Sequence, residues 1–415
     1  MSQPPPPSLR EAVLAITSAD HVAHLTDVHS GLVLRAYKPC ATGHAGGFTA
    51  LSASAPHFAV LLKDKGVLAV FSHDRDQPLS KCPLPERLRT VSASPSGRLL
   101  AAGSETGKLY LWDAASGALL QVVDAHFQAI TAIAWSWDEV MVASGSADAI
   151  VKVFEVASMA DPLAPPPPPL HTLSTHTLPI TALSFSHSPS ATGRLFSASL
   201  DHAAKAHDLA TGATLATYLC PSPIHGLALD PADMTVYLAG DAGAVYSTPL
   251  VGAPGVALAG SAPVISLRAS WCSVHPTARV TSVAVSPSGT RVVAGTASGT
   301  VSIVDAGSRT VVRSLPAMSA PVVGLHTMIV HEPAAPLVSS SHGHRNNNNN
   351  DSRSKVSGSS LPLVATLARF KAASAADVAD FALAAPSTFP NGSGLVEDHG
   401  LAAVDRFLLA VGDLN

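Results

Sequence analysis

Two histidine–aspartate pairs are the residues of this chain that are best placed to do chemistry. His126 and His176 each stand before a strand-like run, and Asp148 and Asp201 each follow the next such run. A carboxylate beside an imidazole orients the ring and supports general-base catalysis. The same pair can instead fix a loop against a turn. Because the two pairs recur with a common period, which an active site does not need, the structural interpretation is favoured.

Other motifs with catalytic or binding chemistry are missing from the sequence. There is no G-x-S-x-G nucleophile elbow, phosphate-binding loop or dinucleotide fingerprint. The cysteines are Cys40, Cys82, Cys220 and Cys272. They are far apart and form no CxxC pair, so they predict buried small side chains, not a zinc site or a disulfide framework. We therefore expect no enzyme activity, no cofactor and no metal.

An internal repeat supplies the elements that position the two pairs. Residues 94–113 read SPSGRLLAAGSETGKLYLWD, and residues 286–305 read SPSGTRVVAGTASGTVSIVD; the two align without a gap. Weaker copies lie at 135–155, 195–208 and 236–250. Their spacing is close to the period of about 40–45 residues that is typical of WD repeats, with insertions in the longer steps.

Each copy has the pattern of three short strands and tight turns, followed by a fourth strand. Two more degenerate copies, 11–38 and 50–82, precede the five clear ones. Together they predict an all-β fold, a seven-bladed WD-repeat β-propeller. Because an open ring would leave bare strand edges, residues 321–331 are expected to supply the innermost strand of the first blade. The insertions around Pro165–Pro169 and at 251–279 are expected to lie between blades.

Composition and charge narrow the class of protein. The chain has 415 residues, of which 47% are apolar and 13% charged, and a formal net charge of −4. Such a chain can bury a large core, and without a long basic run it is poorly suited to binding that relies on phosphate contacts. The start MSQPPPPSLRE lacks the features of a signal peptide, and no run approaches 18 apolar residues. We expect an intracellular protein without membrane contact.

The predicted domain organisation has four parts. A disordered N-terminus (1–9) precedes the propeller (10–335), which ends with the closing strand at about 321–331. Residues 336–360 are polar and of low complexity, which predicts a flexible loop. Residues 361–415 are expected to form a C-terminal strap and a weakly helical tail.

WD-repeat blades share a hydrogen-bonded set: a loop His, a Ser or Thr in the second strand, a turn Asp and a third-strand Trp. His126 with Asp148 fits this spacing, and Phe154 stands in the Trp position. His176 with Asp201 fits it as well. Each Asp is expected to accept a hydrogen bond from its His and so to hold a loop against a turn.

The remaining blades depart from this pattern. Trp112 and Asp113 form the Trp-Asp pair of the third blade, but Thr106 stands at its turn and no His precedes it. His207 and Val304 replace the Trp elsewhere. The predicted structural residues are Trp112, Asp113, His126, Asp148, His176 and Asp201.

Six stretches, in this order, carry a closer resemblance. They are KLYLWDAASGALLQVVDAHFQAIT, HTLPITALSF with GRLFSASLDHAAKAHDLATGATL, YLAGDAGAVYSTPL, and APVVGLHTMIV with LPLVATLARFK. Together they resemble the pre-rRNA-processing WD-repeat family, which includes vertebrate WD repeat-containing protein 18 and its fungal and plant counterparts. The resemblance spans most of residues 10–370. Family members often end in a long charged helix, whereas the tail here is short and Ala-rich.

The resemblance implies a non-enzymatic scaffold subunit of a nuclear complex, found in nucleolus and nucleoplasm. That complex matures the 60S pre-ribosome and promotes removal of the second internal transcribed spacer. The implied partners are two helical-repeat subunits and, through them, a large AAA-type ATPase and the pre-60S particle. Direct RNA contact is left open.

Two rival classes of function are compatible with a propeller. One is a substrate adaptor of a ubiquitin ligase or of a chromatin or replication-licensing complex. The other is a propeller hydrolase, which would need ionisable groups gathered in one cleft. Fold alone does not separate these classes.

Overall fold

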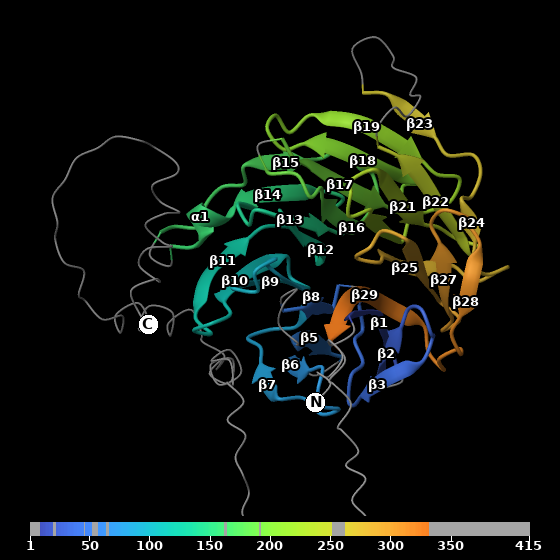
Figure 1. The fold of residues 1–415 in the computed structure, drawn as a ribbon. Helices are drawn as coiled ribbons and strands as arrows, with labels where there is room; N and C mark the ends of the chain where they lie inside the picture. Colours follow the sequence, from blue (N-terminus) through green and yellow to red (C-terminus); the bar gives the residue numbers. More distant parts are fainter. Residues whose placement is uncertain are drawn as a thin grey trace, which may run out of the picture.

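Seven separate β-sheets form the molecule, and they are arranged in a ring (Figure 1). The computed structural model describes residues 9–331 apart from 20–21, 45, 52–56, 64–65, 162–163, 191 and 251–261. Six sheets have four strands and one has five. The predicted all-β, seven-bladed propeller is therefore confirmed.

The strands of the first four blades are given from the innermost strand outward. Blade one contains β29 (Val322–His331), β1 (Leu9–Thr17), β2 (Ala23–Asp27) and β3 (Val33–Tyr37). Blade two contains β4 (Phe48–Ala50), β5 (His57–Leu62), β6 (Val67–Ser72) and β7 (Ser80–Pro83). Blade three contains β8 (Leu88–Ala93), β9 (Leu99–Ser104), β10 (Lys108–Asp113) and β11 (Leu119–Asp124). Blade four contains β12 (Ile130–Trp135), β13 (Met141–Ser146), β14 (Val151–Glu155) and β15 (His171–Leu173).

The other three blades follow the same plan. Blade five contains β16 (Ile180–Phe185), β17 (Arg194–Ser199), β18 (Ala203–Asp208), β19 (Thr214–Leu219) and β23 (Val264–Ser266). Blade six contains β20 (Gly226–Leu229), β21 (Thr235–Ala239), β22 (Ala244–Pro249) and β24 (Cys272–Ser273). Blade seven contains β25 (Val280–Val285), β26 (Arg291–Thr296), β27 (Val301–Asp305) and β28 (Val311–Ser314).

The core lies between neighbouring blades. Strands in the middle of a blade are covered on both faces, and they therefore read as continuous apolar runs. In β5 every residue after His57 is buried, and in β6 every residue after Val67 is buried. One apolar cluster joins Leu68 of blade two to Leu100 and Trp112 of blade three. Because each blade shares its core with its neighbours, the ring is stabilised as one unit.

A bulge at the second residue of several innermost strands also joins neighbouring blades. The pairing register of β12, β16 and β25 shifts at this residue, which in each case is a threonine. The hydroxyls of Thr131 and Thr181 donate to main-chain carbonyls of the next blade at 2.6 and 2.9 Å. Thr281 donates in the same way to β29. A bulged residue leaves the ladder of its own sheet, so its side chain is free to reach the neighbour.

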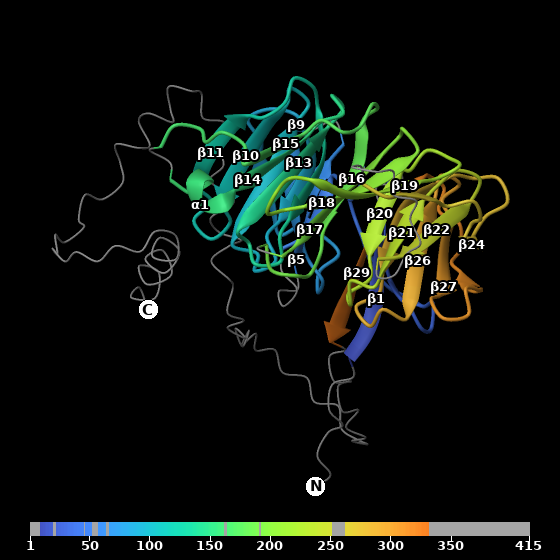
Figure 2. The same ribbon diagram turned by 90° about the horizontal axis from the view of Figure 1, so that it is seen from above.

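The ring is closed by the pairing of β29 with β1. The two strands are antiparallel along their length, from Leu9 opposite His331 to Thr17 opposite Val322. Figures 1 and 2 show orange β29 beside blue β1. On the other side of β29, the Thr327 hydroxyl donates to a carbonyl of β25 at 2.6 Å. The last described strand thus joins blade seven to blade one.

Both long insertions lie within blades, so the expectation that they lie between blades is wrong. Pro165–Pro169 connects β14 to β15, the third and fourth strands of blade four, and residues 251–279 include the connection from β22 to β24 in blade six. The outer edge of a blade faces solvent, and a longer connection there leaves the inner strands in register. Strand β23, which pairs in parallel with β19, had no sequence prediction.

Several expected segments fall outside the described residues. They are most of 1–9, except Leu9 where β1 begins, the end of the predicted propeller after residue 331, and all of 336–360 and 361–415. Within the described ranges the one helix is α1 (Val156–Met159), which has four residues, and no helix there is long and apolar enough to cross a membrane.

Removal of the closing strand tests this architecture. A chain that ends at residue 315 lacks β29, so β1 would expose its inner edge, and blade seven would lose the strand that packs on one of its faces. We expect this chain to aggregate and to melt at a lower temperature than a chain that ends at residue 335, which keeps β29. Light scattering after size-exclusion chromatography and a thermal scan measure both properties. Equal dispersity and melting of the two chains would contradict closure by β29.

Candidate functional site

The two histidine–aspartate pairs lie on one face of the disc, which we call the upper face. This face carries the loops between blades and the turns between the second and third strands of each blade. His126 and His176 lie in the loops that enter blades four and five, and Asp148 and Asp201 lie in the turns that follow β13 and β17. The repeat itself therefore brings each His to its Asp.

Blade five holds an unbroken chain of hydrogen bonds from its fourth strand to the upper face. His176 Nδ1 lies 2.9 Å from Asp201 Oδ2, and its Nε2 lies 2.8 Å from Ser197 Oγ. Ser197 Oγ lies 3.1 Å from His207 Nε2, and His207 Nδ1 lies 3.3 Å from Thr214 Oγ1. If each member donates to the next, from Thr214 toward Asp201, every group is satisfied with both imidazoles neutral. His207 thus makes the serine contact of the Trp that it replaces.

Blade four contains a shorter version of the same chain. His126 Nδ1 lies 3.1 Å from Asp148 Oδ2, and His126 Nε2 lies 2.9 Å from the hydroxyl of Ser144. The position that His207 holds in blade five belongs here to Phe154, which is buried but has no polar atom to offer Ser144.

Both aspartates also hold the main chain of the loop that carries their histidine. Asp148 accepts a hydrogen bond from the Phe127 amide at 3.4 Å, and Asp201 accepts one from the Thr177 amide at 3.1 Å. Their other carboxylate oxygens accept amides within the turn, at 3.0 Å in each case. Each set therefore fixes one loop and one turn in a single arrangement.

These sets have the connectivity of a serine–histidine–aspartate triad, but their burial excludes catalysis. Both hydroxyls, of Ser144 and Ser197, lie in central strands at 0% exposure, and the side chains of His126 and His176 are also fully buried. A nucleophile must reach a substrate carbon, and these hydroxyls cannot. The general-base interpretation of the two pairs therefore fails on geometry.

Blade three uses different residues for the same task. Ala102 occupies the position of Ser144 and Ser197, so the serine of the set is missing. Glu86, from the loop that enters the blade, accepts hydrogen bonds from Thr106 at 3.1 Å and from the Tyr110 hydroxyl at 2.7 Å. Sequence reasoning missed Glu86 because it looked for a histidine.

The predicted pair Trp112 and Asp113 is split between the core and the surface. Trp112 is buried and stacks on Tyr110, with ring centroids 5.3 Å apart. Asp113 instead accepts the amides of Ala115 and Ser116, at 3.2 and 3.1 Å, in the turn before β11. The structure therefore does not place Asp113 in a histidine–aspartate set.

A further histidine–aspartate pair, in blade six, had no sequence prediction. His225 Nε2 lies 2.9 Å from Asp241 Oδ1, and the main-chain amide of Asp241 donates a hydrogen bond to the Ser222 hydroxyl at 3.2 Å. The His and Asp of this pair are closer in sequence than those of blades four and five. The His-to-Asp spacing of those blades therefore did not predict it.

Burial and the pairing partners shift the pKa values of these groups. Burial, together with the neighbouring His176 and Lys205, lowers the pKa of His207 to about 4. Burial alone would raise the pKa of Asp201, but the hydrogen bond and positive charge available from His176, together with backbone amides, lower it to about 2. Asp201 is therefore a carboxylate, and His207 is neutral, at physiological pH.

The described residues contain no metal-binding arrangement. No group of three His, Cys, Asp or Glu side chains among them is placed to hold a metal ion. All four cysteines are free and buried, and burial raises the pKa of Cys40 to about 12 and that of Cys82 to about 11. Such thiols are packed as small apolar side chains.

Comparison with protein families gives the class. A model of the WD domain, G-beta repeat, matches residues 81–113, 117–155, 167–208 and 267–305. Each match begins within or before the outermost strand of one blade and ends with the third strand of the next, so the sequence repeat is one strand out of phase with the blade. The chain is a WD-repeat β-propeller.

Comparison with individual proteins narrows the family. The chain is 30% identical over 294 residues to the pre-rRNA-processing protein IPI3 of Meyerozyma guilliermondii. The aligned region covers 64% of this chain and 65% of that protein. It is 28% identical over 331 residues to IPI3 of Yarrowia lipolytica, covering 77% and 76%. It is 34% identical over 186 residues to IPI3 of Mycosarcoma maydis, covering 41% of this chain and only 31% of that protein. The chain is a homologue of the IPI3 pre-rRNA-processing proteins.

Because the hydrogen-bonded set of blade four holds a loop against a turn, its loss is expected to destabilise the fold. Asp148→Ala leaves the buried His126 and the Phe127 amide without an acceptor, which we expect to lower the free energy of unfolding by about 1–3 kcal/mol. Urea unfolding followed by circular dichroism measures this change. Asp124→Ala, at the exposed end of β11, is the matched control and should change stability little. Equal effects of the two variants would mean that the set contributes nothing.

Buried neutral histidines predict a loss of stability in acid. The pKa values of His73, His207 and His326 are each lowered to about 4, in each case chiefly by burial. In the unfolded chain they protonate near their ordinary pKa of about 6.5. The unfolded state therefore binds more protons between about pH 6.5 and 4, and the free energy of unfolding falls as the pH falls through that window.

A variant separates one histidine from the others. His207→Trp keeps a donor for Ser197 and removes one titrating group, so the slope of unfolding free energy against pH should become shallower. Urea unfolding at several pH values between 4 and 7.5 gives the slope, whatever the absolute stability of the variant. An unchanged slope would show that His207 does not titrate as its burial requires.

Proposed function

We propose that this protein is a non-enzymatic scaffold subunit of a nuclear complex that processes pre-rRNA and matures the 60S ribosomal subunit. The observation that carries the proposal is the similarity to IPI3 proteins along 294 and 331 residues. The names of those relatives state pre-rRNA processing, and the reaction proposed here is removal of the second internal transcribed spacer. Nuclear location, in nucleolus and nucleoplasm, follows from that role.

The upper face supports a role in protein contacts. Phe127 is 93% exposed and Leu178 is 47% exposed, and both lie in the loops held by the histidine–aspartate sets. Because Asp148 binds the amide of Phe127, this ring is presented from a fixed backbone. Rigid aromatic side chains that lose little entropy on binding are frequent anchors of protein–protein interfaces.

The proposed partners are two helical-repeat subunits, through which a large AAA-type ATPase and the pre-60S particle are engaged. A disc of seven rigid blades offers several separate surfaces, as a subunit that joins two large proteins requires. The serine hydroxyls of the two triad-like sets are buried, which favours the scaffold over the hydrolase. An adaptor for a ubiquitin ligase or for a chromatin or replication-licensing complex remains the alternative outcome of the test.

Depletion of the protein tests this role directly. We expect cells that lack it to accumulate precursor RNA that retains the second internal transcribed spacer, detected by RNA blotting with a spacer probe. Expression of the full chain should restore processing, and the chain that ends at residue 315 should not. Affinity purification of the full chain should recover two helical-repeat proteins. Normal processing together with a purification that lacks both partners would refute the ribosomal role.

A further inference from the structure

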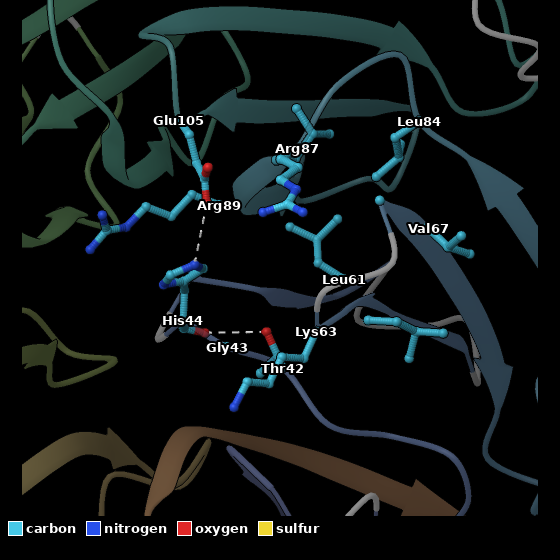
Figure 3. Close-up of a pocket in the computed structure, with 13 residues that line it drawn as sticks. Thr42, Gly43, His44, Leu61, Lys63, Val67, Leu84, Arg87, Arg89 and Glu105 are labelled. Carbon is cyan, nitrogen blue, oxygen red and sulfur yellow. Dashed lines mark hydrogen bonds and ion pairs between the residues drawn. The ribbon is translucent and has the colours of Figure 1, made fainter.

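A pocket opens on the upper face between blades two and three. It encloses about 160 Å³, and its apolar lining comes from strands and loops of both blades: Leu61, Leu62, Val67, Leu84 and Leu88. Four side chains that are basic or can become so, those of His44, Lys63, Arg87 and Arg89, line the same pocket (Figure 3). The pocket is smaller than the roughly 300–1,000 Å³ of most small-molecule sites, so it fits one or two side chains of a peptide.

Arg89 departs from the repeat in a way that serves this pocket. It is the bulged second residue of β8, at the shift between Leu88 and Thr90. In blades four, five and seven this position is a threonine whose hydroxyl binds the next blade. In blade three an arginine takes its place and lines the pocket instead. The repeat alone gives no reason for a guanidinium at this position.

The positive charge of the pocket is not neutralised by the described residues. Among the residues that the structure describes, no carboxylate lies within 4.0 Å of the charged group of Lys63, Arg87 or Arg89. Glu105 is the one acidic residue that lines the pocket, and its Oε1 lies 3.9 Å from Nε2 of His44. Elsewhere the guanidinium of Arg291 lies 2.7 Å from the Asp305 carboxylate. The pocket therefore keeps three cations beside an apolar floor, on a chain whose net charge is −4.

We propose that this pocket binds an acidic peptide segment of a partner protein, with an apolar side chain against the leucines and carboxylates on Arg87, Arg89 and Lys63. Arginine binds carboxylates through two parallel hydrogen bonds, which gives such a contact direction as well as charge. The inference concerns this surface alone and does not depend on the role in pre-rRNA processing.

The lining favours a peptide over RNA. Proteins that bind single-stranded RNA stack its bases on aromatic side chains. No Phe, Tyr or Trp is among the residues that line this pocket, all of which are described, and its floor is aliphatic. An aliphatic floor inside a basic rim matches a peptide in which leucine alternates with Asp and Glu.

Binding of a labelled probe to the full chain tests the proposal. The probe is a twelve-residue peptide, about the length of a short linear motif, in which leucine alternates with Asp and Glu. We expect saturable binding that weakens as salt is raised, since surface ion pairs are screened. The variant Arg87→Glu with Arg89→Glu should weaken binding at least about tenfold, and the milder Arg87→Gln with Arg89→Gln should weaken it less. Circular dichroism establishes that each variant is folded.

A matched variant and two further probes separate the outcomes. Lys81→Glu with Arg268→Glu makes the same change in net charge at exposed sites outside the pocket and should bind as the unchanged protein does. A peptide with Lys in place of Asp and Glu should not bind. Equal weakening by both charge-reversal variants would show that binding is nonspecific and overturn the proposal. Binding of a poly-uridine oligonucleotide but not of the acidic peptide would also overturn it.

Discussion

The antiparallel pairing of β29 with β1 is the contact on which the rest of this molecule depends. Each blade of the ring buries its apolar faces only because it has a neighbour on either side. The pairing joins the first and last described strands, so no blade is left with one bare face. Thr281 and Thr327 then bind β29 and β25 to each other across the junction. The shared cores between blades follow from this closure.

Within a closed ring, polar sets on the upper face decide how the loops are held. The chain from Thr214 to Asp201 fixes one loop and one turn of blade five with every member satisfied. Where the repeat lacks a member, another residue supplies the contact: His207 replaces a tryptophan and Glu86 replaces a histidine. In each case the buried polar groups keep hydrogen-bond partners, because a buried polar group without a partner is costly in free energy. The loops held in this way carry exposed side chains such as Phe127.

The sequence was sufficient for the architecture because the repeat is visible in it. Alternating strands, turn residues and a period near that of WD repeats predict seven blades. The spacing of His126 and Asp148 pointed to a pair that lies at 3.1 Å. The insertions were placed wrongly, since the sequence repeat is one strand out of phase with the blade and its ends look like blade boundaries.

Other features could not be found by analogy with the repeat. Glu86 in blade three and the pair of His225 with Asp241 in blade six make polar contacts like those of the histidine–aspartate sets in blades four and five. They do so with a different residue type or a different sequence spacing. Strand β23 pairs with a distant strand, and no local pattern reports such a partner. The basic pocket depends on Arg89, which stands out only when its bulged position is compared with Thr131 and Thr181 in three dimensions.

Hydrogen exchange of the native protein tests the central claim, that one closed ring holds all seven blades. Amides that open only when the whole ring unfolds share one free energy of opening. Closure predicts that the amides of β29 and β1 exchange as slowly as those of β12 and β13, within about tenfold, and that a denaturant raises all of these rates together. Rapid exchange of β29 while β12 and β13 stay protected would show that β29 is not part of the ring and would contradict the account.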